Sequence, residues 1–223
     1  MTTDVTAVLG GTGLFATLSA DDLAAVAAAS RLRRFRRGQV VFSTGDPGDS
    51  LIVVVSGRVK VVVRSADGGE LTLTIIGPGT VLGEISVADG GPRSADAETL
   101  EESSLLLVPR EVVQEICARV PSVGQALTRS IAAMLRRLTE AASDLIFLDM
   151  PRRVAKVLLS QPRGADGTIR LTLSQEELAH QVGSTRQSVN AALRGFERRG
   201  WIGVQGRTVT VTEAAALSRF AGN

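Results

Sequence analysis

Residues 31–108 carry the pattern that most limits how this chain of 223 residues can fold. Short runs of Val, Ile and Thr alternate there with glycines, as in QVVFSTGDPGDSLIVVVSGRVKVVVRSADGGELTLTIIGPGT. Short β-branched runs separated by turns at regular spacing are typical of a β-sandwich or β-barrel. Turn signals recur at Gly45, Gly48, Gly57, Gly68–Gly69, Gly77 and Gly79, and SADGGE between two strands predicts a hairpin turn.

Helical patterns flank this β region. Residues 18–30, LSADDLAAVAAAS, predict a helix capped by Ser19, with two aspartates in its first turn. Residues 110–120 predict a second helix, which Pro121 ends. A long helical pattern then runs from residue 122 to about 148.

The long helix has an apolar seam. Its members are spaced 4, 3, 4 and 3 residues apart: Ile131, Leu135, Leu138, Ala142 and Leu145. This spacing is typical of a helix that pairs with another helix, and it predicts a dimer. The alternative is a helix buried on its own β domain, and the two are compatible because a helix has two faces.

The sequence DMPRR at residues 149–153 marks a domain boundary, with Asp149 as a cap and Pro151 in the first turn of the next helix. We therefore predict an α+β protein with parts at 1–120, 121–149 and 150–223. Residues 1–150 carry 14 Lys and Arg against 18 Asp and Glu, a net −4. Residues 151–223 carry 11 against 5, a net +6, which predicts a polyanionic partner for this last part.

The C-terminal part contains LSQEELAHQVGSTRQSVNAALRGFERRGWI. Ser174 and Glu177 form a capping box at the start of one helix, and Gly183 marks a tight turn. Ser184 or Thr185 caps a second helix that ends at Gly200. Two short helices joined in this way predict a helix-turn-helix, and the hairpin at 201–212 would form its wing.

The second helix of a helix-turn-helix enters the DNA major groove with its N-terminal residues against the base edges. Arg reads guanine, and Gln or Asn reads adenine, through paired hydrogen bonds. Val189, Leu193 and Phe196 should pack inward, and a helical hairpin with a solvated polar face is the alternative. The predicted DNA-binding residues are Ser174, Gln175, Ser184, Thr185, Arg186, Gln187, Ser188, Asn190 and Arg194, with Arg198 and Arg199 as further phosphate contacts.

GEISVADGGPRSA at residues 83–95 places one acid, Glu84, and one base, Arg93, between two predicted strands. One interpretation is a surface loop with a salt bridge between them. The other is a pocket for a small anion that also carries a hydroxyl. A guanidinium binds phosphate oxygens through a fork of donors, and a short helix starting near Glu84 would aim amides at the anion. Gly83 permits close approach, and Ser94 and the Ala95 amide are further donors.

Several protein classes are excluded. MTTDVTAVLGGTGLF lacks the pattern of a secretory signal, no apolar run is long enough to span a membrane, and Cys117 has no partner for an internal disulfide. A cytoplasmic location is expected. There is no metal-ligand cluster, no nucleophile–base pairing and no Walker-type loop, and His180 is the one histidine, so an enzyme is not expected.

The chain resembles the CRP/FNR family of bacterial regulators over nearly its whole length. The resemblance rests on GDPGDSLIVVVSGRVKV, GEISVADGGPRSA, DLIFLDMPRRVAKVLL and LSQEELAHQVGSTRQSVN. It implies an N-terminal cyclic-nucleotide-binding β-barrel of the jelly-roll type, a long dimerisation helix and a C-terminal winged helix-turn-helix. It also implies that Arg93 pairs with the cyclic phosphate and that Glu84 accepts a hydrogen bond from the ribose 2′-hydroxyl. The implied nucleotide-binding residues are Gly83, Glu84, Ile85, Arg93, Ser94, Ala95, Leu138 and Thr139.

The sequence departs from the family pattern at three positions. Members that respond to cAMP have a hydroxyl pair on the dimer helix that reaches the adenine; Thr139 keeps a hydroxyl and Leu138 does not. A base-reading position that is usually glutamate is Gln187, and the arginine position one turn further is Ala191. Iron–sulfur sensors need several cysteines and haem sensors need axial ligands, so neither branch of the family fits.

The resemblance implies a homodimeric transcription regulator that binds a two-fold symmetric DNA site under the control of a cyclic nucleotide. We expect cAMP as the ligand, with cGMP or no ligand as open alternatives. RNA polymerase is the expected further partner if the protein is an activator, and no membrane partner is expected. Two alternative hypotheses are a ligand-independent regulator and a nucleotide-binding module that acts mainly through a protein partner.

Overall fold

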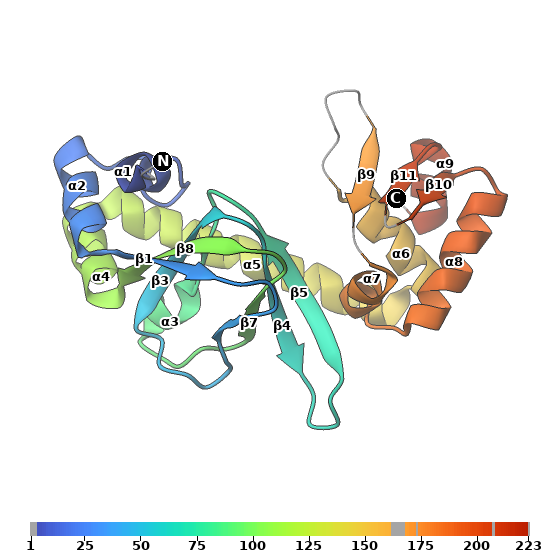
Figure 1. Cartoon of the computed structure of the whole chain (residues 1–223), viewed down its shortest axis with the longest axis horizontal. Coiled ribbons are helices and arrows are strands. Elements are labelled where there is room, and N and C mark those ends of the chain that lie inside the picture. The colour runs from blue at the N-terminus through green and yellow to red at the C-terminus, as the bar shows by residue number, and fades with distance from the viewer. Residues whose placement is uncertain (1–3, 162–167, 173, 207, 223) are drawn as a thin grey trace. The chain divides into compact units, whose positions relative to one another are not determined.

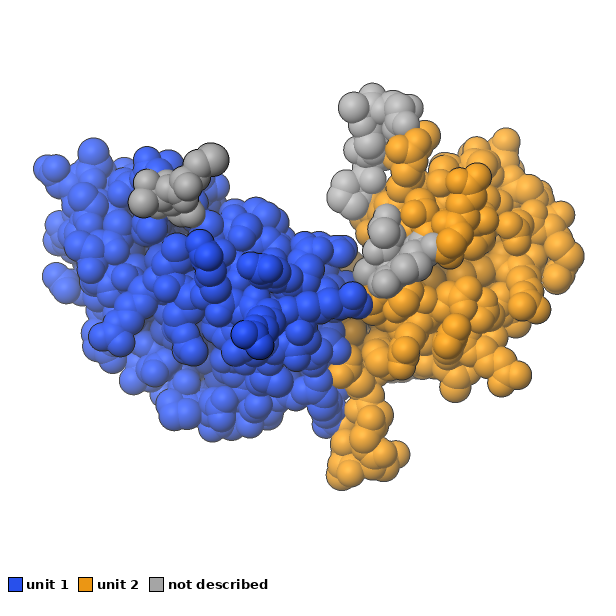
Figure 2. All heavy atoms as spheres, in the orientation of Figure 1, with its two compact units in different colours: residues 1–64, 73–137 blue, residues 65–72, 138–223 orange. Residues whose placement is uncertain are grey.

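The computed structural model describes residues 4–161, 168–172, 174–206 and 208–222. Contacts divide it into two units, coloured separately in Figure 2. Unit 1 comprises residues 1–64 and 73–137, and unit 2 comprises residues 65–72 and 138–223. The division between residues 137 and 138 falls inside the long helix α5 (Pro121–Phe147).

The β region forms two four-stranded sheets (Figure 1). The strands of the first sheet, in spatial order, are β1 (Arg31–Phe35), β8 (Ser103–Pro109), β3 (Ser50–Ser56) and β6 (Val81–Leu82), each antiparallel to the next. The strands of the second are β2 (Val40–Phe42), β7 (Asp96–Thr99), β4 (Val59–Arg64) and β5 (Glu70–Ile76). The predicted fold class is confirmed, although "barrel" applies only loosely because the strands form two separate sheets.

The central strand β3 is buried on both faces. Ile52 and Val54 point into an apolar core that residues of both sheets share. Leu51 and Val53, on the opposite face of the pleat, pack with the helices of unit 1. This double burial explains why the strand has a continuous apolar run rather than alternating apolar and polar residues.

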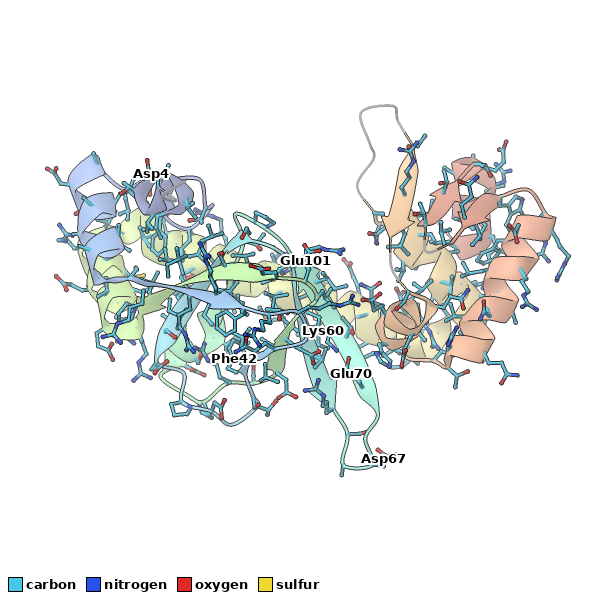
Figure 3. All side chains as sticks on the ribbon, in the orientation of Figure 1. Asp4, Phe42, Lys60, Asp67, Glu70 and Glu101 are labelled. Carbon is cyan, nitrogen blue, oxygen red and sulfur yellow. The ribbon has the colours of Figure 1, made fainter. Side chains whose placement is uncertain are left out.

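The helices of unit 1 cover the outer face of the first sheet. They are α1 (Val5–Gly10), α2 (Ala20–Ala29), α3 (Glu84–Asp89), α4 (Arg110–Arg119) and the start of α5. Ser19 caps α2 as predicted, because its side chain accepts the amide hydrogen of Asp22. Helix α1 was not predicted; Asp4, labelled in Figure 3, caps it by accepting from the Ala7 amide. Pro121 does separate α4 from α5, and it forms the first residue of α5.

The predicted turn between β4 and β5 is confirmed. The Ser65 amide donates to the Gly69 carbonyl and the Gly68 amide to the Ser65 carbonyl. Gly68 has a φ of 87°, a left-handed conformation that glycine adopts without strain.

Unit 2 contains a helical core and a small sheet. Its helices are α6 (Met150–Leu159), α7 (Gln175–Val182), α8 (Arg186–Arg198) and α9 (Ala214–Ala221). Strands β9 (Ile169–Thr172), β11 (Thr208–Val211) and β10 (Ile202–Gln205) form an antiparallel sheet with β11 in the middle. Asp149 caps α6, as predicted, by accepting from the Arg152 amide.

Candidate functional site

The site in unit 1 begins at Gly83, the residue before α3. Gly83 has φ 90° and ψ 15°, in the left-handed region where other residues are strained. A Cβ atom built on Gly83 would also overlap the guanidinium of Arg93. The position therefore requires glycine for two independent reasons, and one of them is that Arg93 occupies the adjacent space.

Arg93 is buried, with only 4% of its surface exposed. Its Nη1 donates to the Ser86 hydroxyl at 3.0 Å, and its Nη2 donates to the Ser50 carbonyl at 2.7 Å and to the Ser50 hydroxyl at 3.2 Å. The guanidinium carbon lies 4.4 Å from the ring centre of Phe42, which is labelled in Figure 3. Burial lowers the pKa of Arg93, while the nearby Asp49 and Asp46 oppose this effect. These contacts fix a buried cation between two serines, a backbone carbonyl and an aromatic ring.

Glu84, the first residue of α3, is likewise 4% exposed. Its Oε1 accepts a hydrogen bond from the Ser130 hydroxyl on α5 at 2.9 Å. Its Oε2 is buried and has no hydrogen-bond partner in the structure. Burial raises the pKa of this carboxyl; its own amide, Ser130 and Arg137 act in the opposite direction.

The salt-bridge interpretation of this stretch is wrong. Among the ion pairs of the described residues there is none between Glu84 and Arg93, and Arg93 lies 4.0 Å from Asp49 instead. Both side chains are buried, although Arg93 belongs to the loop between α3 and β7. Each of the two buried side chains keeps one unpartnered polar atom, Glu84 Oε2 and Arg93 Nε. Unsatisfied buried polar atoms cost free energy, so their presence points to a ligand that offers a donor to the carboxylate and an anion to the guanidinium.

The remaining predicted pocket residues differ in position. Ile85 on α3 is half-buried, Ala95 is buried and Ser94 is exposed. Leu138 and Thr139 lie in unit 2 with exposed side chains on α5, and their part in the pocket stays a prediction.

Five residues that contact the side chain of Glu84 or Arg93 were not predicted: Phe42, Asp49, Ser50, Ser86 and Ser130. All five are common residue types in ordinary sequence contexts. One feature of the sequence could have indicated Ser130. Ser130 and Arg137 are polar residues seven apart on α5, which places both on one face of that helix.

The site in unit 2 is the helix-turn-helix. Ser174 and Glu177 form the predicted capping box of α7. Gly183 ends α7 in a left-handed conformation with φ 60°. Thr185, rather than Ser184, caps α8, because its side chain accepts from the Ser188 amide at 3.2 Å. Helix α8 ends at Arg198, two residues before the predicted Gly200.

Helix α8 has one buried and one exposed face. Val189, Leu193 and Phe196 are buried as predicted. The exposed predicted contacts are Thr185, Arg186, Gln187 and Arg194; Ser174, Gln175, Ser184, Ser188 and Asn190 are half-buried. Phe196 also packs with Trp201 and Phe220, ring centres 5.9 and 5.5 Å away, which fixes α8 against the wing and α9.

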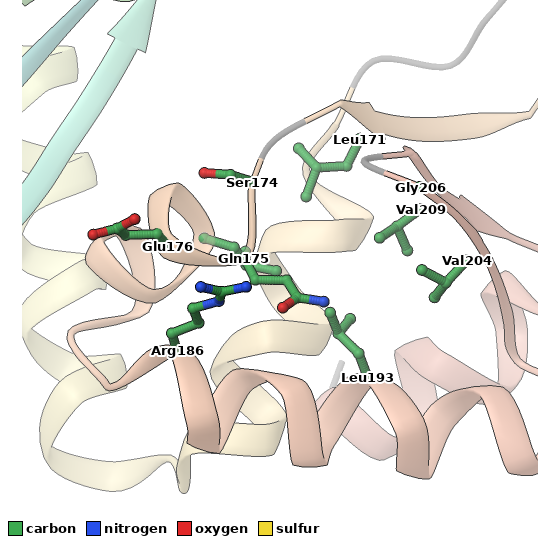
Figure 4. Close-up of a pocket in the computed structure, with 10 residues that line it drawn as sticks. Leu171, Ser174, Gln175, Glu176, Arg186, Leu193, Val204, Gly206 and Val209 are labelled. Atoms are coloured by element: carbon green, nitrogen blue, oxygen red, sulfur yellow. The ribbon is translucent and has the colours of Figure 1, made fainter.

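A pocket of about 300 Å³ lies between α7, α8 and the wing (Figure 4). Its wall is apolar on the side of the sheet, at Leu171, Val204 and Val209. Its helix side is mixed: Arg186 and Gln175 lie next to each other there, and Leu178 and Leu193 also line it. The pocket therefore adjoins the N-terminal end of α8, the part of the helix predicted to read bases.

A β-sandwich that buries an acid and a base with unpartnered polar atoms, a long helix and a winged helix-turn-helix define a DNA-binding regulator with a ligand domain. The family model of the cyclic nucleotide-binding domain matches residues 32–120, and that of the Crp-like helix-turn-helix domain matches residues 152–220. The chain belongs to the CRP/FNR family of transcription regulators.

Two relatives match nearly full length. The CRP-like cAMP-activated global transcriptional regulator of Mycobacterium tuberculosis is 39% identical over 220 residues, 96% of this chain and 98% of the relative. The cyclic AMP receptor protein of Thermus thermophilus is 32% identical over 211 residues, 95% and 97% of the two chains. A solved structure, the c-di-GMP responsive global regulator CLP of Xanthomonas campestris, has a TM-score of 0.75 and 26% identity, covering 86% of this chain and 99% of that one.

The chain belongs to a family of transcription regulators, so the prediction that it is not an enzyme is confirmed. Among the helices of the described residues, none combines the length and apolarity needed to cross a membrane.

Proposed function

We propose that this protein is a homodimeric transcription regulator whose binding to a two-fold symmetric DNA site is controlled by a cyclic nucleotide, with cAMP as the ligand. The proposal divides the chain into a sensor (1–120), a dimerisation helix (121–149) and a DNA-binding domain (150–223). The observation that carries it is the pair of buried, separately held charges, Glu84 and Arg93, each with one unpartnered polar atom.

The donor set of this pocket fits a cyclic nucleotide. The Arg93 guanidinium is suited to the cyclic phosphate, since it is cationic and fixed by Ser50 and Ser86. The free Oε2 of Glu84 is suited to the ribose 2′-hydroxyl, because a carboxylate only accepts hydrogen bonds. A nucleotide supplies an anion and a hydroxyl within one small molecule, as the two buried groups require.

The exposed part of α5 supports a dimer. Val123 and Leu127 are buried in unit 1, and Ile131 packs against the same core. Further along the seam, Leu135 is 64% exposed and Leu138 is 37% exposed. Exposed leucines at coiled-coil spacing are typical of a helix that pairs with a second copy. We therefore propose that the start of α5 packs on its own β domain and that its exposed leucines form the dimer contact.

The polar face of α8 supports DNA binding. Arg186 is exposed at its first turn, and Arg194 lies two turns further on the exposed side. With Gln187 and Ala191 in place of the usual family residues, we expect a site related to the family palindrome with altered preference at individual base pairs. One bidentate base contact changes discrimination by about 1–3 kcal/mol. If the protein activates transcription, RNA polymerase is its further partner.

The decisive experiment is calorimetric titration with cAMP, cGMP and c-di-GMP, each with and without a palindromic duplex. We expect cAMP to bind and its affinity to rise when DNA is present, because coupling between two sites is reciprocal. Arg93→Ala, checked for folding by circular dichroism, should abolish nucleotide binding. Unchanged affinity in a folded Arg93→Ala protein would refute the pocket assignment.

A ligand-independent regulator is the second candidate, and Leu138 favours it. Its side chain cannot hydrogen-bond a base, and the lost bond is worth about 1 kcal/mol. Equal DNA affinity with and without each nucleotide would establish this candidate. Tight nucleotide binding combined with DNA affinity that does not depend on sequence would instead favour a module that acts through a protein partner.

A further inference from the structure

The Glu84 carboxylate is held by a residue of a different element. Ser130 lies on α5, well separated in sequence from α3, and its hydroxyl donates to Glu84 Oε1 at 2.9 Å. The other oxygen, Oε2, is buried without a partner. The two oxygens of one carboxylate are thus in different states, one bonded to the protein and one open.

This asymmetry matters because the free-energy cost of burying a carboxylate can be lowered in two ways. It can take up a proton, which makes it a donor as well as an acceptor, or it can keep its charge by accepting hydrogen bonds. The hydroxyl of Ser130 favours the second outcome. Burial raises the pKa of Glu84, and the groups that lower it are its own amide, Ser130 and Arg137.

We propose that Ser130 is a positioning residue for nucleotide recognition: by bonding Oε1, it keeps the carboxylate oriented and ionised so that Oε2 accepts the ribose 2′-hydroxyl. The inference rests on the proposed function, since it assumes that a nucleotide binds at Glu84. It assigns part of the selectivity for ribose over deoxyribose to α5, the helix proposed to carry the dimer contact.

The chain offers a matched control on the same helix. Thr128 lies two residues before Ser130, and its hydroxyl donates to the Gly124 carbonyl of its own helix at 2.9 Å. Removing that hydroxyl changes α5 without touching Glu84. Ser130→Thr keeps a hydroxyl at the critical position and serves as the conservative variant.

The test measures the affinities of cAMP and 2′-deoxy-cAMP for the full-length protein and its Ser130→Ala, Ser130→Thr and Thr128→Ala variants. A hydrogen bond to a charged acceptor corresponds to about a tenfold preference or more for cAMP in the unmodified protein. We expect Ser130→Ala to reduce this preference to about threefold or less. Ser130→Thr and Thr128→Ala should retain the full preference.

A pH series gives a second readout that a merely structural role would not move. Ser130→Ala removes a bond that favours the ionised carboxylate, so the pH below which cAMP affinity falls should move upward. The charged group facing Glu84 from α5 is Arg137, which all the variants keep. Thermal melts confirm that each variant is folded.

The outcomes are distinguishable. If the unmodified protein binds neither nucleotide, the proposed function fails. If it prefers cAMP and Ser130→Ala keeps both that preference and the pH profile, the inference about Ser130 is overturned while the pocket stands. A preference that survives in Glu84→Gln would show that the hydroxyl is recognised elsewhere, which also overturns the inference.

Discussion

Replacing Gly83 with alanine tests whether the fixed guanidinium of Arg93 shapes the pocket. The left-handed backbone at Gly83 costs an alanine about 1–2 kcal/mol. The new methyl group would also occupy the space of the Arg93 guanidinium. Displacing that group breaks its bonds to the Ser86 hydroxyl and to the carbonyl and hydroxyl of Ser50. At about 1 kcal/mol net for each hydrogen bond, the free energy of unfolding should fall by about 3 kcal/mol more.

Gly79 supplies the matched control. Its φ of 80° carries a similar backbone strain, but a Cβ built there meets no atom within 4 Å. Gly79→Ala should therefore lower the free energy of unfolding by the backbone strain alone, about 1–2 kcal/mol. Urea denaturation gives the difference between the two variants, and calorimetry with cAMP shows whether affinity falls only in Gly83→Ala. Equal destabilisation of the two variants would mean that Arg93 moves aside without cost, and the argument for a fixed guanidinium would fail.

Three other variants have defined outcomes. Glu84→Gln should stabilise the unliganded protein at neutral pH and weaken cAMP binding. Burial raises the pKa of Glu84, so the folded state holds this proton more tightly than the unfolded state, and the free energy of unfolding falls as pH rises through that range. Urea denaturation of both proteins at acidic and neutral pH checks this. Arg186→Ala should weaken binding to the specific duplex more than to a random one, whereas Arg198→Ala should weaken both alike. Fluorescence anisotropy measures both affinities. If Arg186→Ala lowers the two affinities equally, Arg186 is only a phosphate contact. Ser174→Ala should cost about 1 kcal/mol of the free energy of unfolding by removing the cap of α7, and an unchanged denaturation midpoint would contradict this role.

Local signals in the sequence predicted most elements of the fold. Ser19, Asp149 and Ser174 are caps in the structure as in the prediction, because an N-cap acts within three residues of itself. The short runs of Val, Ile and Thr predicted strands, but the packing of the two faces of β3 on different partners depends on contacts distant in sequence.

Two short helices escaped prediction. Helix α1 has six residues and α9 has eight, and a helix of that length is set mainly by packing rather than by its own propensity. Leu9 of α1 and Leu217 of α9 are each completely buried, which supplies that packing.

The candidate pocket could be predicted only in part. Residue type alone left two interpretations of Glu84 and Arg93, an ion pair or an anion pocket, and the resemblance to the family favoured the second. The fold gives them different partners, Ser130 for one and Ser50 with Ser86 for the other. These partners come from α5, β3 and α3, and no sequence spacing reveals which serine will face which charge.

The small sheet of unit 2 has a consequence for the order in which the protein forms during synthesis. Its middle strand, β11, is made after both helices of the helix-turn-helix, while its partner β9 is made before them. Until β11 has left the ribosome, β9 has no strand to pair with and the apolar wall at Leu171 and Val209 is not assembled. The DNA-reading helices should therefore reach their final packing only after β11 has been made, and not as soon as the two helices themselves have left the ribosome.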